Sequence, residues 1–414
     1  MTTYSHESVF EDACHNGQIP GAVLVAADAT GKFRYAKAFG KTAFGETLST
    51  DSVMWLASCT KLMTAVAALQ QVERGHIGLD EDIDKILPEL AALQVLEGFD
   101  DEGNPIYQKR DSNYSEAERS FCTRHLLSHS SGLAYPMTEP KLQQLATKTD
   151  PSAAPPRTIV AEFSTPLFFQ PGQGWVYGSS CDWAGKIVER LSGLPLEDYM
   201  RANIWDPLGM EHISFAPNTN PEMQACKVGM SLRDESGKLV PTTEGYLQQF
   251  EDRNEAYGGA ASWGSAEAYL RLLQCLCAGD GRVLGKSLVD EMFRPQLGPE
   301  AKESMNHAIR TIESQRRIQA NSFDMRHQVL DHGLGGEIGL RDEVGRRLAG
   351  TMSWGGLPNL IWWIDRKAGL CGAYFSQLVP PGDTEVNKLE AVFERAIYEQ
   401  YEKFRSDALV EDRD

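Results

Sequence analysis

The chain has 414 residues, of which 42% are hydrophobic and 24% are charged, and its formal net charge is -18. This length allows one large domain or a main domain with an inserted lobe, and the composition is that of a folded protein. The acidic balance disfavours a nucleic-acid partner, because a phosphate backbone is bound by basic surfaces. No apolar run approaches the roughly 20 residues of a membrane span. The N-terminal stretch Met1 to Gln18 lacks an apolar signal core, so we expect a cytoplasmic protein that acts on small molecules.

The eight cysteines are scattered without paired spacing, and neither C-x-x-C nor H-E-x-x-H occurs. We therefore expect reduced thiols and predict neither a metal site nor a cofactor. The stretch Gly279 to Ser287 is similar to a phosphate-binding loop, but five residues separate its glycines where four are required. No nucleotide site is predicted.

The predicted strands lie at the two ends of the chain. Ala22 to Ala27 and Phe33 to Phe39 are joined by Asp28-Ala-Thr-Gly31, which indicates a hairpin. Near the other end, apolar runs separated by turn residues predict an antiparallel meander over Arg347 to Trp354, Leu360 to Ile364 and Leu370 to Gln377. Apolar residues at helical spacing predict a helix over Thr384 to Phe404 that covers one face of this meander.

If both ends share one sheet, the fold is α/β, an antiparallel sheet flanked by N- and C-terminal helices with a mainly helical lobe inserted. The predicted boundaries are 1–60 and 300–414 for the sheet lobe and 61–299 for the helical lobe, together one catalytic unit with its site in the groove between them. Two stretches, Gly98 to Arg119 and Pro136 to Pro156, are predicted to be irregular, and either could close over the groove.

A serine and a lysine three residues apart form the first candidate site. The segment Trp55-Leu-Ala-Ser58-Cys-Thr-Lys61 opens a predicted helix, so Ser58 lies near the positive end of the helix dipole and Lys61 shares its face. A lysine can accept the proton of a serine only in its neutral form, which apolar surroundings favour. Ser58 is therefore a candidate nucleophile and Lys61 its general base. The alternative is an N-cap serine followed by a solvated lysine.

Five further motifs follow along the chain: Gly75-x-Ile-x-Leu-Asp80, His125-Leu-Leu-Ser-His-Ser-Ser-Gly-Leu133, Pro171-Gly-x-x-Trp-x-Tyr177-Gly-Ser179, Pro207-Leu-Gly-Met210 and Gly258-Gly-Ala-Ala-Ser262. With Ser58-x-x-Lys61, this ordered series resembles class C β-lactamases, which have the penicillin-binding-protein fold, and their esterase and acyltransferase relatives. The resemblance runs from about Gly17 to Tyr401 and implies a serine β-lactamase-like fold with an acyl-enzyme on Ser58. No G-x-S-x-G elbow occurs, which argues against an α/β-hydrolase.

The second element of that family is Y-x-N, which Tyr177-Gly-Ser179 matches with serine in place of asparagine. The resemblance implies that Tyr177 bonds the nucleophile and helps to carry its proton, and a phenol held beside an ammonium is suited to this. The alternative is a half-buried core tyrosine. Ser179 is a candidate substrate contact, and the loss of asparagine puts recognition of an amide side chain in doubt.

The third family element, K-T-G or H-x-G, corresponds to the strand Ser353-Trp354-Gly355-Gly356-Leu357, where the cation is absent. The resemblance implies an oxyanion hole made by the backbone N–H groups of Ser58 and Leu357. Trp354, Gly355 and Gly356 are candidate substrate-binding residues, because glycines let a carbonyl approach closely. Tryptophan in place of the cation removes the anchor for a β-lactam carboxylate and suits an apolar acyl or polyketide surface.

Three stretches resemble the fungal polyketide transesterases of the lovastatin type: Val95 to Asp101, Tyr177 to Lys186 and Gly356 to Cys371. This resemblance implies transfer of an acyl group from a carrier-protein or thiol thioester to the hydroxyl of a small, polyketide-like molecule. Trp55, Phe168 and Phe169 are candidates to line an apolar groove, or they could be core residues. The basic residues Arg310, Arg316, Arg317 and Arg326 could dock an acidic carrier protein, or they could be a solvated face.

Three other functions remain open on the sequence alone. The first is an intracellular carboxylesterase with the same Ser-Lys-Tyr site, and the second is a β-lactamase or D-Ala carboxypeptidase, which the missing cation disfavours. The third is an inactive binding protein on this scaffold, although Ser58, Lys61 and Tyr177 are all present. We interpret His125, His129 and His332 as structural residues.

Overall fold

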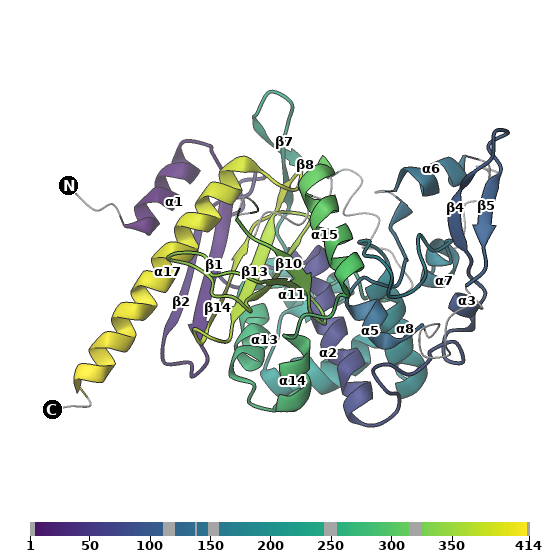
Figure 1. The fold of residues 1–414 in the computed structure, drawn as a ribbon. Helices are drawn as coiled ribbons and strands as arrows, with labels where there is room; N and C mark the ends of the chain where they lie inside the picture. The colour runs from purple at the N-terminus through teal and green to yellow at the C-terminus, as the bar shows by residue number, and fades with distance from the viewer. Residues whose placement is uncertain are drawn as a thin grey trace.

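The computed structural model describes residues 5–110, 121–136, 139–147, 157–243, 255–313, 316, 325 and 327–411. Within these residues the main feature is a large antiparallel sheet (Figure 1). It has seven strands in the order β10-β11-β12-β13-β14-β1-β2. Its strands are β1 (Gly21–Asp28), β2 (Arg34–Gly40), β10 (Leu330–His332), β11 (Glu337–Gly339), β12 (Met352–Gly356), β13 (Leu360–Asp365) and β14 (Leu370–Phe375). The two ends of the chain therefore share one sheet, which confirms the predicted α/β fold.

Strand β1 lies between β2 and β14 and is buried along its whole length. Val23 pairs with Ala38 of the hairpin partner on one side and with Phe375 on the other. Alternate residues of β1 enter two different cores, Val23 on one face of the sheet and Leu24 on the other. This explains its uninterrupted apolar sequence, because a strand covered on both faces has no polar side.

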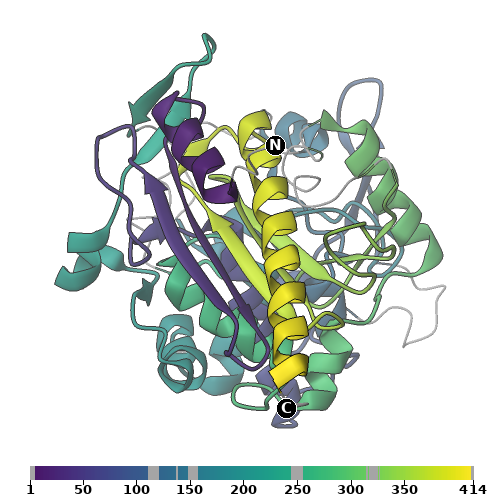
Figure 2. The same ribbon diagram turned by 90° about the vertical axis from the view of Figure 1, so that its left-hand side faces the viewer.

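Helices cover both faces of the large sheet. On one face lie α1 (His6–His15) and α17 (Thr384–Glu411), which cross in front of the strands in Figure 2. Phe10 of α1 contacts the ring of Tyr374 of β14, and Phe393 of α17 packs edge-on against Trp363 of β13. The opposite face packs on α2 (Thr60–Glu73) and α13 (Ala266–Ala278). The predicted C-terminal helix is thus present.

The residues between the early and late strands are mostly helical. The remaining helices are α3 (Pro88–Ala91), α5 (Thr123–Leu127), α6 (Pro140–Ala146), α7 (Ile159–Phe163), α8 (Ser180–Ser192), α9 (Leu196–Met200), α10 (Asp206–Leu208), α11 (Pro221–Cys226), α14 (Lys286–Met292) and α15 (Pro299–Thr311), with short turns η1 (Ala57–Cys59), η3 (Arg201–Trp205) and η4 (Pro217–Thr219). Small strands are β3 (Met54–Trp55), β4 (Val95–Phe99), β5 (Pro105–Gln108), β6 (Ile213–Ser214), β7 (Met230–Arg233), β8 (Leu239–Thr242), β9 (Trp263–Gly264) and β15 (Leu378–Val379). Across the described residues, no helix has both the length and the apolar character needed to cross a bilayer.

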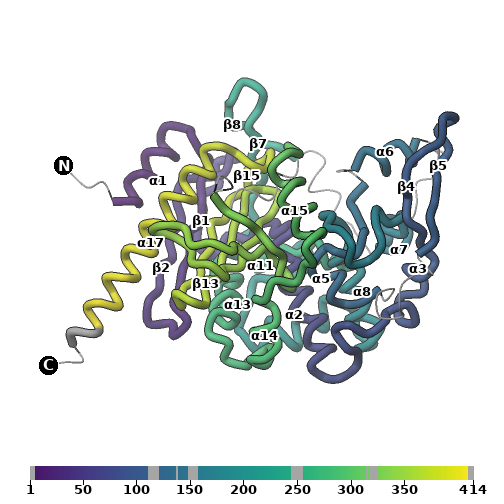
Figure 3. Tube along the Cα trace, viewed as in Figure 1, coloured from purple at the N-terminus to yellow at the C-terminus, as the bar shows by residue number. Residues whose placement is uncertain are grey.

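The stretch Gly98 to Arg119 was predicted to be irregular, but its first part forms regular structure. Strands β4 and β5 form an antiparallel hairpin at the end of the molecule remote from the chain termini (Figure 3). Its turn is closed by Asp100, whose Oδ1 accepts the N–H groups of Glu102 and Asn104, so a side chain supplies the turn. Residues 111–119 of this prediction lie outside the described residues.

The stretch Pro136 to Pro156 also differs from its prediction. Residues Pro140–Ala146 form helix α6, with Pro140 at the first helical position, where its missing N–H costs no hydrogen bond. Residues 137–138 and 148–156 lie outside the described residues.

The strand predicted over Arg347 to Trp354 begins five residues later, at Met352. The preceding chain turns away from the sheet because Arg346 and Arg347 are buried and bond to Glu390 and Glu394 of α17. Unpaired, these charges would be costly to bury, so the ion network determines where the strand starts.

The strand predicted over Leu370 to Gln377 ends at Phe375. The side chain of Gln377 accepts the backbone N–H of Trp55 and donates to the carbonyl of Trp55, each at 3.1 Å. The following two residues, β15, pair in parallel with β7 instead of continuing the large sheet. The end of β14 is therefore tied to the segment that leads to the candidate nucleophile.

Candidate active site

Ser58 lies in a tight turn between strand β3 and helix α2. The preceding residue, Ala57, has φ of +45°, a region that residues with a Cβ rarely occupy. The turn is held by two hydrogen bonds, Cys59 N–H to the Leu56 carbonyl at 3.0 Å and Thr60 Oγ1 to the Ala57 carbonyl at 2.6 Å. The surrounding structure therefore imposes the conformation that presents Ser58.

The structure brings together the three residues predicted to be catalytic. Ser58 Oγ lies 2.5 Å from Tyr177 OH and 3.1 Å from Lys61 Nζ. Tyr177 lies three residues before the start of α8, and Lys61 is only 2% exposed although it is in the first turn of α2. The alternative of a solvated lysine is therefore wrong. This geometry permits a proton to pass from Ser58 to either neighbour.

Two further groups accept hydrogen bonds from Lys61. Its Nζ donates to Gly259 O at 2.6 Å and to Tyr135 OH at 3.2 Å. With Ser58 Oγ these make three acceptors, one for each N–H of an ammonium group. When the lysine is neutral, its two remaining N–H groups can stay on Tyr135 and Gly259. The lone pair then points at Ser58, which is the orientation that a general base needs.

Tyr135 is in turn fixed by a buried carboxylate. Its hydroxyl donates to Asp182 Oδ2 at 3.2 Å, and Asp182 Oδ1 accepts the N–H of Gly259 at 2.9 Å. Burial raises the pKa of Tyr135 well above its usual range, and the charge of Asp182 raises it further. Tyr135 therefore stays neutral, gives its single proton to Asp182 and keeps a lone pair for Lys61.

Sequence reasoning assigned no role to Tyr135, Asp182 or Gly259. Each had a signal, however. Tyr135 follows the motif that ends at Leu133 by two residues, and Gly259 lies inside the motif Gly258 to Ser262. Asp182 is a carboxylate in the first turn of α8, next to the buried Trp183, where the helix dipole favours a negative charge.

The segment Gly258 to Ala260 forms the back of the site. Its successive carbonyls accept Thr64 Oγ1 at 2.7 Å, Lys61 Nζ, and Trp55 Nε1 at 2.7 Å. A Cβ on Gly259 would collide with Asp182, so the backbone can approach only as glycine. Trp55 was predicted to line the substrate groove, but it is 1% exposed and packs behind the nucleophile. That prediction is wrong.

A cluster of aromatic rings packs beside Tyr177. The indole of Trp354 stacks on His129 with 6.0 Å between ring centroids and 15° between ring planes. Its centroid lies 5.3 Å from that of the Tyr177 ring and 5.5 Å from that of the His332 ring. Burial lowers the pKa of both imidazoles, that of His332 to about 4, so both are neutral at physiological pH. His129 and His332 thus belong to an uncharged wall, and Trp354, 4% exposed, forms much of it.

The candidate oxyanion and substrate-binding residues differ in how far they are buried. A Cβ on Gly356 would lie 2.6 Å from the Leu56 carbonyl, so the end of β12 runs directly against the nucleophile turn. Gly355, Gly356 and Leu357 are half-buried there. Ser179 is fully buried and its Oγ has no hydrogen-bond partner among the described residues, so any contact with substrate stays a prediction.

Phe168 and Phe169 line a cavity of about 270 Å³ together with Trp175 and residues of α15. Trp175 also contacts the rings of His129 and His332, so this cavity adjoins the aromatic cluster. Among the described residues, no group of three or more His, Cys, Asp or Glu side chains is arranged to hold a metal ion.

Comparison with known proteins identifies the family. A family model described as beta-lactamase matches residues 6–396. The chain therefore belongs to the β-lactamase family, in agreement with its sheet, its flanking helices and the cluster around Ser58.

Relatives within this family carry narrower names. Monacolin J acid methylbutanoyltransferase of Aspergillus terreus is 37% identical over 407 residues, covering 96% of each chain. Lovastatin esterase of Penicillium rubens is 36% identical over 407 residues, covering 96% of this chain and 99% of the relative. The solved structure of unliganded simvastatin synthase (LovD) from Aspergillus terreus matches with a TM-score of 0.87 at 36% identity, covering 96% of this chain and 98% of that one. The predicted enzyme class, a serine acyltransferase or hydrolase of the β-lactamase-like family, is confirmed.

The hydroxyl of Tyr135, which bonds both Lys61 and Asp182, gives a first testable prediction. Tyr135→Phe removes one acceptor of Lys61, so we expect labelling of Ser58 by a serine-reactive phosphonate to slow by about 10-fold or more, because the base loses its orientation. The matched control is Tyr398→Phe, which removes another buried bond between tyrosine and aspartate, to Asp365 at 2.9 Å, on the far face of the sheet. Equal labelling rates in the two variants would contradict the assigned role of Tyr135.

Proposed function

We propose that the chain is an acyltransferase that moves an acyl group from a thioester to a hydroxyl of a small, polyketide-like molecule through an acyl-Ser58 intermediate. The observation that carries this proposal is the contact of Ser58 Oγ with both Lys61 Nζ and Tyr177 OH in a buried cluster. The names of the relatives that transfer methylbutanoyl groups support transfer as the reaction.

The proposed reaction has two displacements. In the first, Lys61 takes the proton of Ser58 while Oγ attacks the thioester carbonyl, and the oxyanion rests on the backbone N–H groups of Ser58 and Leu357. The carbon–sulfur bond then breaks and the thiol leaves with a proton delivered through Lys61 and Tyr177. In the second, the same pair removes the proton of an alcohol, whose oxygen attacks the acyl ester. Collapse returns a proton to Ser58 and releases the new ester.

Substitutions at the three residues test the first displacement. Ser58→Ala and Lys61→Ala should each abolish formation of the acyl-enzyme, because one lacks the nucleophile and the other its base. Tyr177→Phe should lower the rate by ~10²-fold or more, as expected for a lost proton carrier. Intact-mass analysis after incubation with a panel of acyl thioesters measures the acyl-enzyme directly. Wild-type turnover in either alanine variant would exclude this mechanism, and absence of labelling at Ser58 in the native chain would favour a binding protein.

An alcohol rather than water as the second nucleophile is supported by the uncharged wall beside Ser58. The resemblance implies that Trp354 replaces the cation of the larger family, and the indole stacks on the neutral His129. Such a wall offers no partner to the carboxylate of a β-lactam, and it favours an apolar acceptor that excludes water from the ester. The esterase alternative keeps the same residues, and the lovastatin esterase of Penicillium rubens is a comparably similar relative.

Decay of the acyl-enzyme separates transfer from hydrolysis. If transfer is the function, purified acyl-Ser58 protein should hydrolyse slowly in buffer and break down at least about 10-fold faster when a hydrophobic, polyketide-like alcohol is added. The measurement is the loss of the acyl mass with time, with a small polar alcohol as the control acceptor. Fast decay in buffer that no alcohol accelerates would favour the carboxylesterase.

A carrier protein as the acyl donor is supported by a basic face around residues 327–328. Arg310 donates to the Gln328 carbonyl at 2.9 Å and Arg341 to the His327 carbonyl at 2.7 Å, and Arg341 and Arg395 line one cavity of about 370 Å³. Each of the two acidic residues on its rim has a cationic neighbour, because Asp342 lies 3.9 Å from Lys367 Nζ and Glu343 lies 3.5 Å from the guanidinium of Arg346.

This basic face includes part of the stretch that was predicted from the sequence to dock an acidic carrier protein. Arg310 and Arg316 of the predicted docking stretch are exposed, whereas Arg317 and Arg326 lie outside the described residues. In a chain with a net charge of -18, a local basic face attracts an acidic partner.

Charge reversal tests this donor. Arg310→Glu combined with Arg341→Glu should raise the KM for an acylated carrier protein by roughly 10-fold and leave turnover of a small acyl thioester unchanged, because only the protein donor needs the face. Reversal of Lys286 and Lys388, two exposed lysines on other helices, is the matched control. An equal effect on both donors, or none on the carrier protein, would contradict docking at this face.

A further inference from the structure

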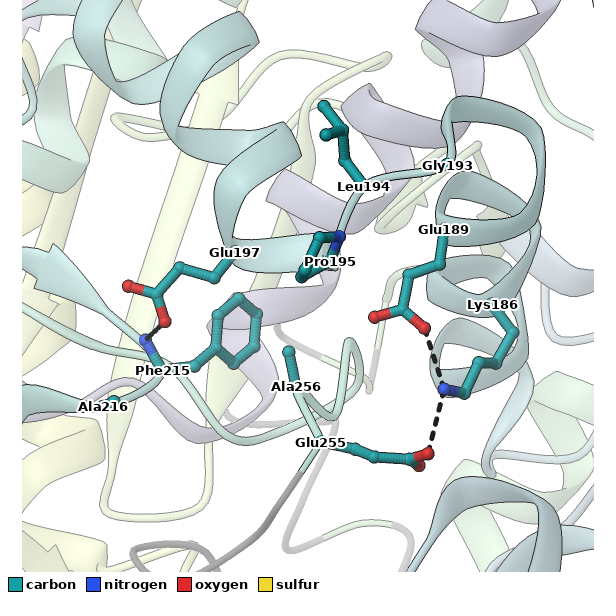
Figure 4. Close-up of a pocket in the computed structure, with 10 residues that line it drawn as sticks. All are labelled: Lys186, Glu189, Gly193, Leu194, Pro195, Glu197, Phe215, Ala216, Glu255 and Ala256. Atoms are coloured by element: carbon teal, nitrogen blue, oxygen red, sulfur yellow. Dashed lines mark hydrogen bonds and ion pairs between the residues drawn. The ribbon is translucent and has the colours of Figure 1, made fainter.

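Lys186 is a half-buried lysine of α8 with no part in the reaction described above. It ends the stretch Tyr177 to Lys186 that carries the resemblance to transesterases. Its Nζ donates to Glu189 Oε2 at 2.8 Å and to Glu255 Oε1 at 3.1 Å, and both bonds are drawn in Figure 4. Burial lowers the pKa of Lys186, but the bonds to Glu189 and Glu255 outweigh burial and raise it. The side chain is therefore charged at neutral pH.

Glu255 joins Lys186 to two different segments. Its Oε2 accepts the N–H of Ile159 at 2.8 Å, which fixes the first residue of helix α7. Its own backbone begins the segment that continues to Gly258 and Ala260. One carboxylate held by Lys186 is therefore bonded to the first residue of α7 and lies on the segment that forms the back of the active site.

Both segments reach an acceptor of Lys61. Helix α7 ends at Phe163, whose ring packs edge-on against Tyr135 with 5.8 Å between centroids. The other segment carries Gly259, whose carbonyl accepts Lys61 at 2.6 Å only four residues after Glu255. The Phe163 ring also contacts Tyr257, so the two segments support each other.

We propose that Lys186 is a positioning residue for the catalytic lysine. By holding Glu255 it fixes Tyr135 and Gly259, the two acceptors that direct the lone pair of Lys61 at Ser58. The inference rests on the proposed use of Lys61 as general base. The ion pair borders an open pocket of about 560 Å³ that Leu194 and Phe215 also line (Figure 4), so its loss leaves no closed cavity. A partly exposed ion pair of this kind adds little to stability.

The test compares Lys186→Met with a matched ion pair on the same helix. Arg190, one turn further along α8, bonds Glu89 at 2.6 and 2.8 Å, and among the described residues no hydrogen bond or ion pair joins either of them to the segment from Glu255 to Gly259. We expect Lys186→Met to lower the single-turnover acylation rate of Ser58 by a small acyl thioester roughly 10-fold with KM unchanged, because the base is misplaced and the substrate is not. Arg190→Met should stay within about 2-fold of the native rate, and both should melt at similar temperatures.

Titration with the phosphonate counts the intact sites in each preparation. Lys186→Arg keeps a charge able to bridge Glu189 and Glu255, so it should restore the acylation rate of Ser58. Native acylation in Lys186→Met, an effect confined to KM, or failure of Lys186→Arg to restore the rate would overturn the inference. If the native protein is not acylated by any thioester, the proposed function fails instead. The rate at which the phosphonate labels Ser58 needs no acyl donor, and it then gives the same comparison between Lys186→Met and Arg190→Met.

Discussion

A buried lysine must find an acceptor for every N–H group that it keeps, and the construction of this site follows from that requirement. Lys61 is placed by helix α2 next to Ser58 and away from solvent. Tyr135 and Gly259 then have to reach it from two other parts of the chain, and Asp182 has to hold both of them. The result is an amine beside Ser58 whose direction is set by Tyr135 and Gly259.

The same region holds a strained turn, and its supports come from distant segments. Ala57 with its positive φ is kept in place because Trp55 is bonded by Gln377 beyond the end of β14 and by Ala260 behind the site. Thr60 bonds both the Ala57 carbonyl and Ser262. The large sheet therefore does more than bury apolar surface, because the chain just beyond its strand β14 carries Gln377, which bonds the segment that leads to Ser58.

The site residues that could be predicted from the sequence are those that lie close together in the chain or within one of its ordered motifs. Ser58 and Lys61 are three residues apart across the start of α2, and Tyr177 lies in a motif just before α8. Tyr135, Asp182 and Gly259 each look ordinary alone, since their meeting depends on how α2, α8 and two loops close around one amine. The late start of β12 was unpredictable for a similar reason, because the Arg–Glu network that diverts it spans more than 40 residues.

The position of β1 between β2 and β14 affects how the protein folds while it is synthesised on the ribosome. The hairpin of β1 and β2 is synthesised early, but the neighbour of β1 on its other edge is complete only at Phe375. At roughly 5–20 residues per second, the intervening chain takes on the order of tens of seconds to emerge. For that interval an apolar strand has an open edge, which is the kind of surface that chaperones bind and that nascent chains aggregate through. The turn that carries Ser58 likewise lacks its bonds to Gln377 until that residue is synthesised, so the candidate site is among the last features of the molecule to form.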